Sequence, residues 1–316
     1  MFKKVSSGIL MLVLIVLLGV YFIVRFAGNK ERTFKDKILS FDPAKVTQIL
    51  ISNPGKEAVD LHQTGGKWMV ASNGKDFAAD STQISGMLKT LSNLPTKRYA
   101  GRGKDVWSKY ELTDSAATLV TLKSSGKNIA DLYVGKFTYT QPKGQQQQQQ
   151  SRQQQGDMTT FVRIPKDDDV YAVDGFLKMN FNRDAAAYRN RYLSLVTATD
   201  ITRITDEQPE GRFTIDRQDG KWALNGTPAD SVKVVRYRSA LARIAGSKFI
   251  DDPVLPSSSA YTLTIEGNNF SPITLKAYPV ADTNINFIVT SSYNPGAFFN
   301  GKEGGLFKKI WQGIEF

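Results

Sequence analysis

The chain contains the same eight-residue pattern twice. Residues 34–41 read FKDKILSF and residues 188–195 read YRNRYLSL. The shared order is aromatic residue, cation, Asp or Asn, cation, any residue, Leu, Ser and a large apolar residue. Because self-similarity at a fixed offset is typical of duplicated fold units, the pattern predicts two copies of one module. At 316 residues the chain is long enough for two domains of ordinary size.

Further matches follow each copy in the same order. GGKW and DGKW end at Trp68 and Trp222, and AADS and PADS contain Asp80 and Asp230. We therefore expect the modules to span residues 34–187 and 188–316. Four apolar residues with the same spacing follow in each copy: Ile84, Met87, Leu91 and Leu94 in the first, and Val234, Tyr237, Leu241 and Ile244 in the second.

Each module is predicted to be a mostly antiparallel sheet with one main helix across it, an α+β arrangement. The alternation of apolar and polar residues in VTQILIS and EAVDLHQ predicts two strands. The Gly residues before each GKW tryptophan suit a tight turn, because Gly adopts positive φ without strain. Asp80 and Asp230 are suited to cap a helix, and the apolar stripe that follows fits a helix lying on a sheet.

Residues 138–158 read TYTQPKGQQQQQQSRQQQGDM and have almost no apolar side chains. Such a tract buries too little surface to offset the entropy of ordering it. Because it lies between two strand-like segments, we predict a disordered Gln-rich loop at the tip of a hairpin. Expansion of a tolerated loop is favoured over a partner-binding polyglutamine segment.

The N-terminus contains an apolar segment, residues 5–24, without a charged residue. About twenty helical residues cross the roughly 30 Å hydrocarbon core of a bilayer, so the segment predicts an uncleaved single-pass transmembrane helix. A cleaved signal peptide is disfavoured because the run ends in the bulky sequence YFIVRF. The whole chain is thus expected to be α+β, with residues 1–33 forming a cytoplasmic tail, a transmembrane anchor and a linker.

The orientation of this anchor is not decided by charge. Lys3 and Lys4 precede the apolar segment, whereas Arg25, Lys30 and Arg32 follow it, with Glu31 among them. Two further cations after the segment belong to the repeated pattern and are explained by the module. The two orientations are nearly balanced on this count.

Composition excludes several kinds of site. The chain has no Cys and one His, which excludes disulfides, thiolate chemistry and a metal site with several His ligands within the chain. We expect no cofactor and no metal. His62 lacks a nearby nucleophile in the sequence, and the run of acids after Lys166 lacks the spacing of an EF-hand loop.

Four matched residues have a structural and a functional interpretation. Trp68 and Trp222 suit stacking against a ligand, and Asp80 and Asp230 suit a pair of catalytic acids. Their identical places in the two modules favour core packing for the tryptophans and helix capping for the aspartates.

The densest basic segment is KRYAGRGK, residues 97–104. It presents Lys97, Arg98, Tyr99, Arg102 and Lys104, a mixture that suits contact with an anion or with an acidic partner. It also follows a predicted helix, whose C-terminal dipole explains part of the charge. Walker A, dinucleotide-binding and nucleophile-elbow motifs are absent from the sequence.

The order of these features resembles the bacterial family described as domain of unknown function 4340. The features are the apolar N-terminus, the opening pattern, VTQI, the GKW turn, the capped helix and YEL at residues 110–112. The resemblance covers nearly all of the chain after residue 33. It implies duplicated α/β modules on a membrane anchor and genes beside gliding-motility-type ABC transporter components. It carries over no catalytic residues, and the Gln tract departs from the family pattern.

The sequence and this resemblance together favour a non-catalytic binding or scaffold protein. We expect a single-pass protein of the bacterial inner membrane whose periplasmic body binds a membrane protein such as an ABC transporter subunit. A net charge of +11 suits anionic partners, but the cations are dispersed. Two alternatives remain open: an envelope enzyme acting on glycan or lipid, and a cytoplasmic body that binds nucleic acid through residues 97–104.

Overall fold

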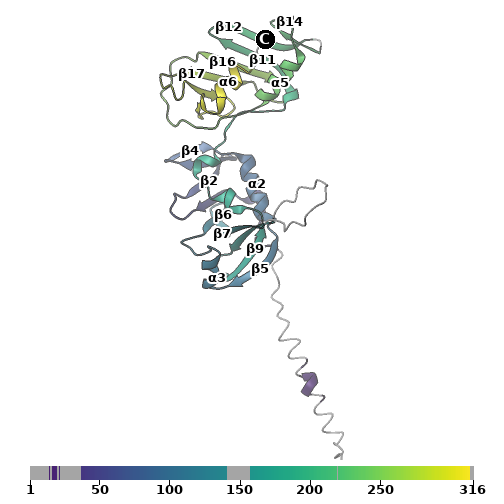
Figure 1. Cartoon of the computed structure of the whole chain (residues 1–316), viewed down its shortest axis with the longest axis vertical. Coiled ribbons are helices and arrows are strands. Elements are labelled where there is room, and N and C mark those ends of the chain that lie inside the picture. The colour runs from purple at the N-terminus through teal and green to yellow at the C-terminus, as the bar shows by residue number, and fades with distance from the viewer. Residues whose placement is uncertain are drawn as a thin grey trace, which may run out of the picture. The chain divides into compact units, whose positions relative to one another are not determined.

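The structure is a computed structural model that describes residues 14, 16–19, 21, 37–140, 157–218 and 220–313 (Figure 1). The chain forms two compact units. Unit 1 consists of Met1–Ala58 and Ser85–Arg183, and unit 2 consists of Val59–Ile84 and Asp184–Phe316.

In unit 1, six strands lie in the order β1-β6-β7-β8-β9-β5, and each neighbouring pair is antiparallel. The register places Ile49 opposite Leu122 and Ile51 opposite Val120. Alternate residues of a strand point to opposite faces, so these four buried side chains share one face of the sheet. The strands are β1 (Gln48–Ser52), β5 (Thr96–Arg102), β6 (Thr118–Ser124), β7 (Lys127–Thr140), β8 (Asp157–Arg163) and β9 (Asp169–Asp174).

The helices of unit 1 are short. They are α3 (Lys104–Lys109) and α4 (Leu177–Phe181), and a 3-10 turn covers Pro43–Lys45. Helix α2 (Ser81–Ser92) begins after Asp80, whose carboxylate accepts hydrogen bonds from the backbone N–H groups of Thr82 and Gln83 at 3.0 Å.

Unit 2 contains three groups of antiparallel strands. The hairpins of β2, β3 and β4 form the first, β10 and β15 form the second, and the third is an eight-stranded sheet of order β14-β13-β12-β11-β16-β17-β18-β19. Strands of the first two groups are β2 (Val59–Thr64), β3 (Lys67–Ser72), β4 (Lys75–Ala78), β10 (Tyr192–Leu195) and β15 (Arg243–Ala245). The eight-stranded sheet consists of β11 (Ile201–Gln208), β12 (Gly211–Gln218), β13 (Lys221–Leu224), β14 (Thr227–Pro228), β16 (Tyr261–Gly267), β17 (Ile273–Pro279), β18 (Phe287–Ser291) and β19 (Phe299–Asn300).

Helices α5 (Ser231–Ala242) and α6 (Leu306–Trp311) pack against this eight-stranded sheet (Figure 1). Trp222 of β13 is buried in the same apolar cluster as Tyr237 and Leu241 of α5. The side chain of Asp230 caps α5 by accepting from the N–H groups of Val232 and Lys233. Trp222 therefore lies in the core beneath a capped helix.

The predicted tight turns at the GKW segments are confirmed. Gly65 and Gly66 between β2 and β3 have φ of 58° and 76°, and Gly220 between β12 and β13 has φ of 81°. These backbone conformations are in the region that only Gly adopts without strain.

One succession of elements occurs twice. Between β1 and its partner β6 the chain forms β2, β3, β4, α2 and β5, with α3 added. Between β11 and its partner β16 it forms β12, β13, β14, α5 and β15. The module boundaries at 34–187 and 188–316 stay a prediction.

The expected α+β chain with a leading transmembrane helix is wrong as a description of this structure, which is mostly antiparallel sheet. Among the described residues no helix is long and apolar enough to cross a membrane. Helices α2 and α5 have 12 residues each, which at 1.5 Å per residue gives about 18 Å, against about 30 Å of hydrocarbon core. The predicted helix at residues 5–24 lies outside the described residues, apart from the helical positions 14, 16–19 and 21.

The predicted Gln-rich loop, residues 138–158, includes residues that belong to strands. Residues 138–140 belong to β7 and residues 157–158 to β8, and Thr140 is paired with Asp157. Residues 141–156 lie outside the part of the chain that the structure describes.

Replacing Trp222 by Ala is expected to lower the free energy of unfolding by about 3–5 kcal/mol, because it leaves a cavity in the cluster beneath α5. Chemical denaturation of the full chain measures this. Val254→Ala is the control: Val254 is almost fully exposed, so this change should alter stability by less than about 0.5 kcal/mol. Equal effects of the two substitutions would contradict the position assigned to Trp222.

Candidate functional site

The basic segment predicted to contact an anion lies on β5 and at the start of α3 in unit 1. Strand β5 pairs with β9, which places acids beside its cations. The ammonium group of Lys97 lies 3.0 Å from Asp174 and also contacts Asp157, and the Nε of Arg102 lies 3.0 Å from Asp169. The hydrogen bond to Asp157 raises the pKa of Lys97.

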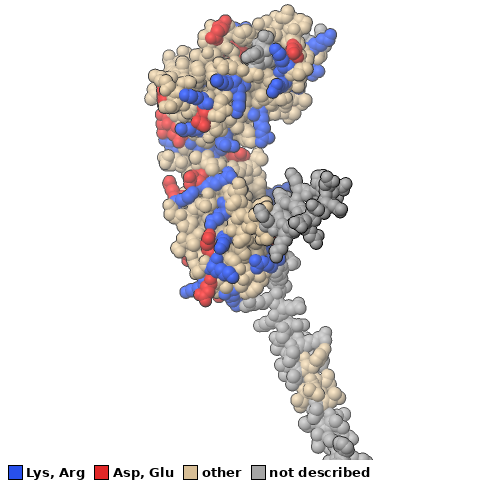
Figure 2. Space-filling view, in the orientation of Figure 1, with Lys and Arg blue, Asp and Glu red and all other residues tan. Residues whose placement is uncertain are grey.

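The remaining members of this segment also contact neighbouring groups. The Arg98 guanidinium lies 5.5 Å from the centre of the Phe161 ring, and the Tyr99 hydroxyl donates to Asp169 at 3.3 Å. Lys104 is exposed at the first position of α3. Figure 2 likewise shows Lys and Arg interspersed with Asp and Glu. Two of the four cations of the segment, Lys97 and Arg102, thus lie beside acids, which weakens the segment as a binding site for a polyanion.

The other residues singled out in the sequence occupy separate places. Trp68 and Trp222 are buried, and Asp80 and Asp230 accept hydrogen bonds at the starts of α2 and α5. His62 on β2 lies 3.2 Å from Asp76 and 3.6 Å from Asp60. The structure does not gather these side chains into one catalytic arrangement.

The acids after Lys166 occupy a turn. The carboxylate of Asp167 accepts from the backbone N–H of Asp169 at 3.1 Å, and Lys166 has a positive φ of 67°. Within the described ranges, no group of three or more His, Asp or Glu side chains is arranged to hold a metal ion.

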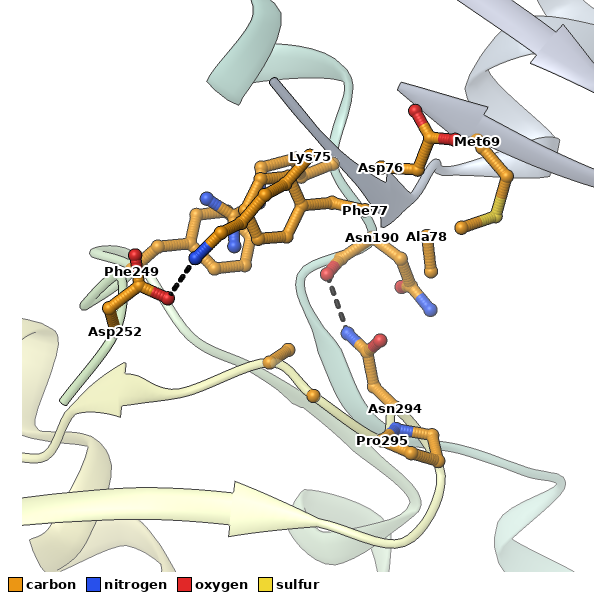
Figure 3. Close-up of a pocket in the computed structure, with 13 residues that line it drawn as sticks. Met69, Lys75, Asp76, Phe77, Ala78, Asn190, Phe249, Asp252, Asn294 and Pro295 are labelled. Carbon is orange, nitrogen blue, oxygen red and sulfur yellow. Dashed lines mark hydrogen bonds and ion pairs between the residues drawn. The ribbon is translucent and has the colours of Figure 1, made fainter. Parts of the chain in front are cut away.

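A cavity of about 270 Å³ in unit 2 brings together residues that the sequence did not single out (Figure 3). Its walls come from β3 and β4, from the segment before β10, from the loop after β15, and from the loop between β18 and β19. The lining residues are Met69, Lys75, Asp76, Phe77, Ala78, Arg189, Asn190, Phe249, Asp252, Asn294, Pro295, Gly296 and Ala297.

Backbone hydrogen bonds set the register of these walls. The N–H of Asn190 donates to the carbonyl of Ala78 at 2.7 Å, and the N–H of Asp80 donates to the carbonyl of Tyr188 at 2.8 Å. Ala79 and Arg189 form an antiparallel bridge between these bonds. The second copy of the opening pattern is therefore attached directly to the end of β4.

Arg189 forms the most buried charged wall of the cavity, with 4% of its surface exposed. Its guanidinium lies 3.7 Å from the centre of the Phe77 ring and 3.8 Å from that of Phe249. Its Nη1 donates to Asp251 at 2.8 Å. A planar cation between two ring faces gains both electrostatic attraction and packing.

Two Asn residues lie opposite this aromatic wall (Figure 3). Asn294, in the loop after β18, donates through Nδ2 to the backbone carbonyl of Asn190 at 2.7 Å. The side-chain Oδ1 of Asn190 accepts from the N–H of Tyr192 at 3.0 Å. Lys75 and Asp252 form an ion pair of 2.5 Å at another side of the cavity.

In the sequence, Arg189 stands out only as part of a repeated pattern. A cation directly after an aromatic residue was the available signal, but it did not reveal Phe77 or Phe249 as partners. These contacts join residues that are far apart in the sequence, and no local periodicity predicts them.

A second notable group in unit 2 is the carboxyl of Asp206 on β11. Burial raises its pKa to about 6, a hydrogen bond from Gln208 at 2.6 Å opposes this rise, and Glu207 adds to it. Tyr237, which donates to the carbonyl of Ile310, also has a raised pKa because it is buried and lies near Asp206. A half-buried carboxyl of this kind is costly to ionise.

Arg189→Lys is expected to lower the free energy of unfolding by about 1–3 kcal/mol, because Lys has no planar group to lie between two rings. Arg203→Lys is the matched control. Arg203 is half-exposed and lies 3.8 Å from Glu266, so its exchange should change stability by less than about 0.5 kcal/mol. Denaturant titration of both variants measures these free energies. An unchanged free energy of unfolding in Arg189→Lys would count against the stacked geometry.

The Asp206 carboxyl predicts a pH-dependent stability. Its pKa in the folded state, about 6, exceeds the ordinary value of 3.8, so the folded state binds the proton more tightly than the unfolded state. Asp206 therefore lowers the free energy of unfolding as the pH rises between these two pKa values. Asp206→Asn should therefore raise the free energy of unfolding at neutral pH by about 1–2 kcal/mol, allowing for partial exposure. The gain should disappear near pH 4. Glu210→Gln, at an exposed carboxyl, should show no such gain in thermal unfolding measured across the same pH range.

The chain was compared with known proteins and protein families. No curated protein and no solved structure matches the chain. A family model described as a domain of unknown function, DUF4340, matches residues 151–264. The match is narrower than the resemblance noted in the sequence, and it includes Arg189, Asn190, Phe249 and Asp252 of the cavity wall. Residues 151–264 are therefore similar to this family of unknown function.

Proposed function

We propose that this protein is a non-catalytic binding protein that serves as an accessory of an ABC-type transport or envelope system. Its partner is a membrane protein, such as a transporter subunit, and it acts outside the cytoplasm. The observation that carries the proposal is the cavity of unit 2, which has an apolar wall, amide groups and internally paired charges.

The composition of this cavity supports binding over catalysis. General acid–base chemistry needs two titratable groups that converge on a reacting atom. Here Lys75 is paired with Asp252, and Arg189 is paired with Asp251 and stacked between rings. Groups held in this way fix the shape of a binding surface and have little freedom to exchange protons with a substrate.

The partner class rests on the family resemblance and on placement of charge. Members of DUF4340 resemble this chain in ordered motifs, and their association with ABC transporter genes motivates a transporter subunit as partner. The cations of β5 lie beside acids, so the described surface gives little support to nucleic acid as partner.

Photocrosslinking from the cavity tests the proposal. A photoreactive amino acid replaces Met69, which lines the cavity, in the full chain within native membranes. The matched control places the same amino acid at the exposed Val254, outside the cavity. We expect a subunit of a transport or envelope complex to be captured from position 69 and not from position 254. Capture of none at position 69, under conditions that capture subunits of known complexes, contradicts the proposal.

A further inference from the structure

The two Asn residues of the cavity present one donor and one acceptor. Asn190 uses Oδ1 to accept from Tyr192, and Asn294 uses Nδ2 to donate to the carbonyl of Asn190. Within the part of the chain that the structure describes, the Nδ2 of Asn190 and the Oδ1 of Asn294 have no hydrogen-bond partner. Asn294 is only 3% exposed, so its orientation is fixed by its surroundings.

This donor and acceptor match the main chain of an extended peptide. One residue of an extended segment presents its own C=O acceptor and N–H donor on the same side. The carbonyl would accept from Asn190 and the N–H would donate to Asn294. A ligand that supplies both hydrogen bonds is therefore favoured over one that supplies neither.

The charges of the cavity exclude a strong preference for an ion. Two cations, Lys75 and Arg189, line it together with two anions, Asp76 and Asp252. Their formal charges cancel, and Arg189 has Asp251 as a further partner. Bringing a charged ligand into this space would cost desolvation without a compensating net field, which favours an uncharged ligand.

The apolar wall has room for one side chain. Met69, Phe77, Phe249, Pro295 and Ala297 contribute apolar surface. A volume of about 270 Å³ lies below the roughly 300–1,000 Å³ of sites that hold a whole small molecule. Since Arg189 already lies on one face of each Phe ring, the aromatic platform that a sugar would use is largely occupied.

We propose that this cavity binds an extended, uncharged segment of a partner polypeptide. The C=O and N–H of one residue of the segment pair with Asn190 and Asn294, and an adjacent aliphatic side chain enters the apolar part of the cavity. This inference rests on the proposed function, since it names the part of the partner that is recognised.

The test uses the full chain, labelled with ¹⁵N in its Asn side-chain amides. Three capped tripeptides serve as probes: acetyl-Ala-Leu-Ala-amide and the two peptides that have Glu or Lys at the central position. A chitin trisaccharide is the fourth probe. At millimolar probe concentrations, a range suited to weak contacts, we expect the Leu peptide to shift the side-chain amide resonances of Asn190 and Asn294. The two charged peptides and the trisaccharide should shift them at least several-fold less.

Two variants separate recognition from folding. Asn190→Asp keeps the acceptor for the Tyr192 N–H but removes the Nδ2 donor, and should weaken binding of the Leu peptide at least fivefold, in line with the loss of one hydrogen bond. Asn128→Asp, the same change at an exposed position of unit 1, should leave binding unchanged. Ala78→Leu fills the cavity and should abolish binding while the thermal unfolding midpoint shows a folded chain.

Three results would overturn the inference: no shift with the Leu peptide, equal shifts with the charged peptides, or a stronger response to the trisaccharide. If the crosslink from position 69 still captures a transport subunit in any of these cases, the proposed function stands and only the recognised segment is wrong. If the Leu peptide binds but no subunit is captured, the cavity is a peptide site of another system.

Discussion

The candidate site depends on the hydrogen bonds between residues 78–80 and residues 188–190. They connect the end of β4 to the second copy of the opening pattern and fix which side chain meets which. Because neighbouring residues of an extended segment point in opposite directions, a slip of one residue would turn Arg189 away from Phe77 and Phe249. The guanidinium, once placed, fills the space between the two rings, and its ion pair with Asp251 offsets the cost of burying charge. The cavity is the space that remains beside this arrangement.

Pairing of cations with acids is the second constraint, and it bears on what the proposed site would recognise. The sequence carries a formal charge of +11, yet Lys97 and Arg102 lie beside acids and Lys75 is paired with Asp252. Fields from closely paired charges fall off quickly in salt solution. Long-range attraction is then a weak source of specificity for these surfaces. Shape and directed hydrogen bonds remain, and they are the interactions that the amide groups and the apolar wall of unit 2 supply.

Local features were predictable from the sequence, whereas the site was not. Gly65, Gly66 and Gly220 mark turns because their backbone conformation is decided within a few residues. The capping bonds of Asp80 and Asp230 are likewise local. The cavity instead joins residues of β3 and β4 to residues more than a hundred positions later, and such contacts leave no periodic trace. The N-terminal apolar segment differs from these local features: its composition predicts a membrane helix, but among the described residues no helix is long and apolar enough to cross a membrane.

The two copies of the repeated pattern differ at the positions on which the proposed recognition rests. At the positions of Arg189 and Asn190, the first copy has Lys35 and Asp36. Lysine has no planar group of the kind that lies between two rings at Arg189. An aspartate in place of Asn190 replaces the free amide donor by a charged acceptor, which would reject a peptide carbonyl. The Leu and Ser of the pattern are the same in both copies, and the residues that distinguish the second copy include those on which the proposed recognition rests.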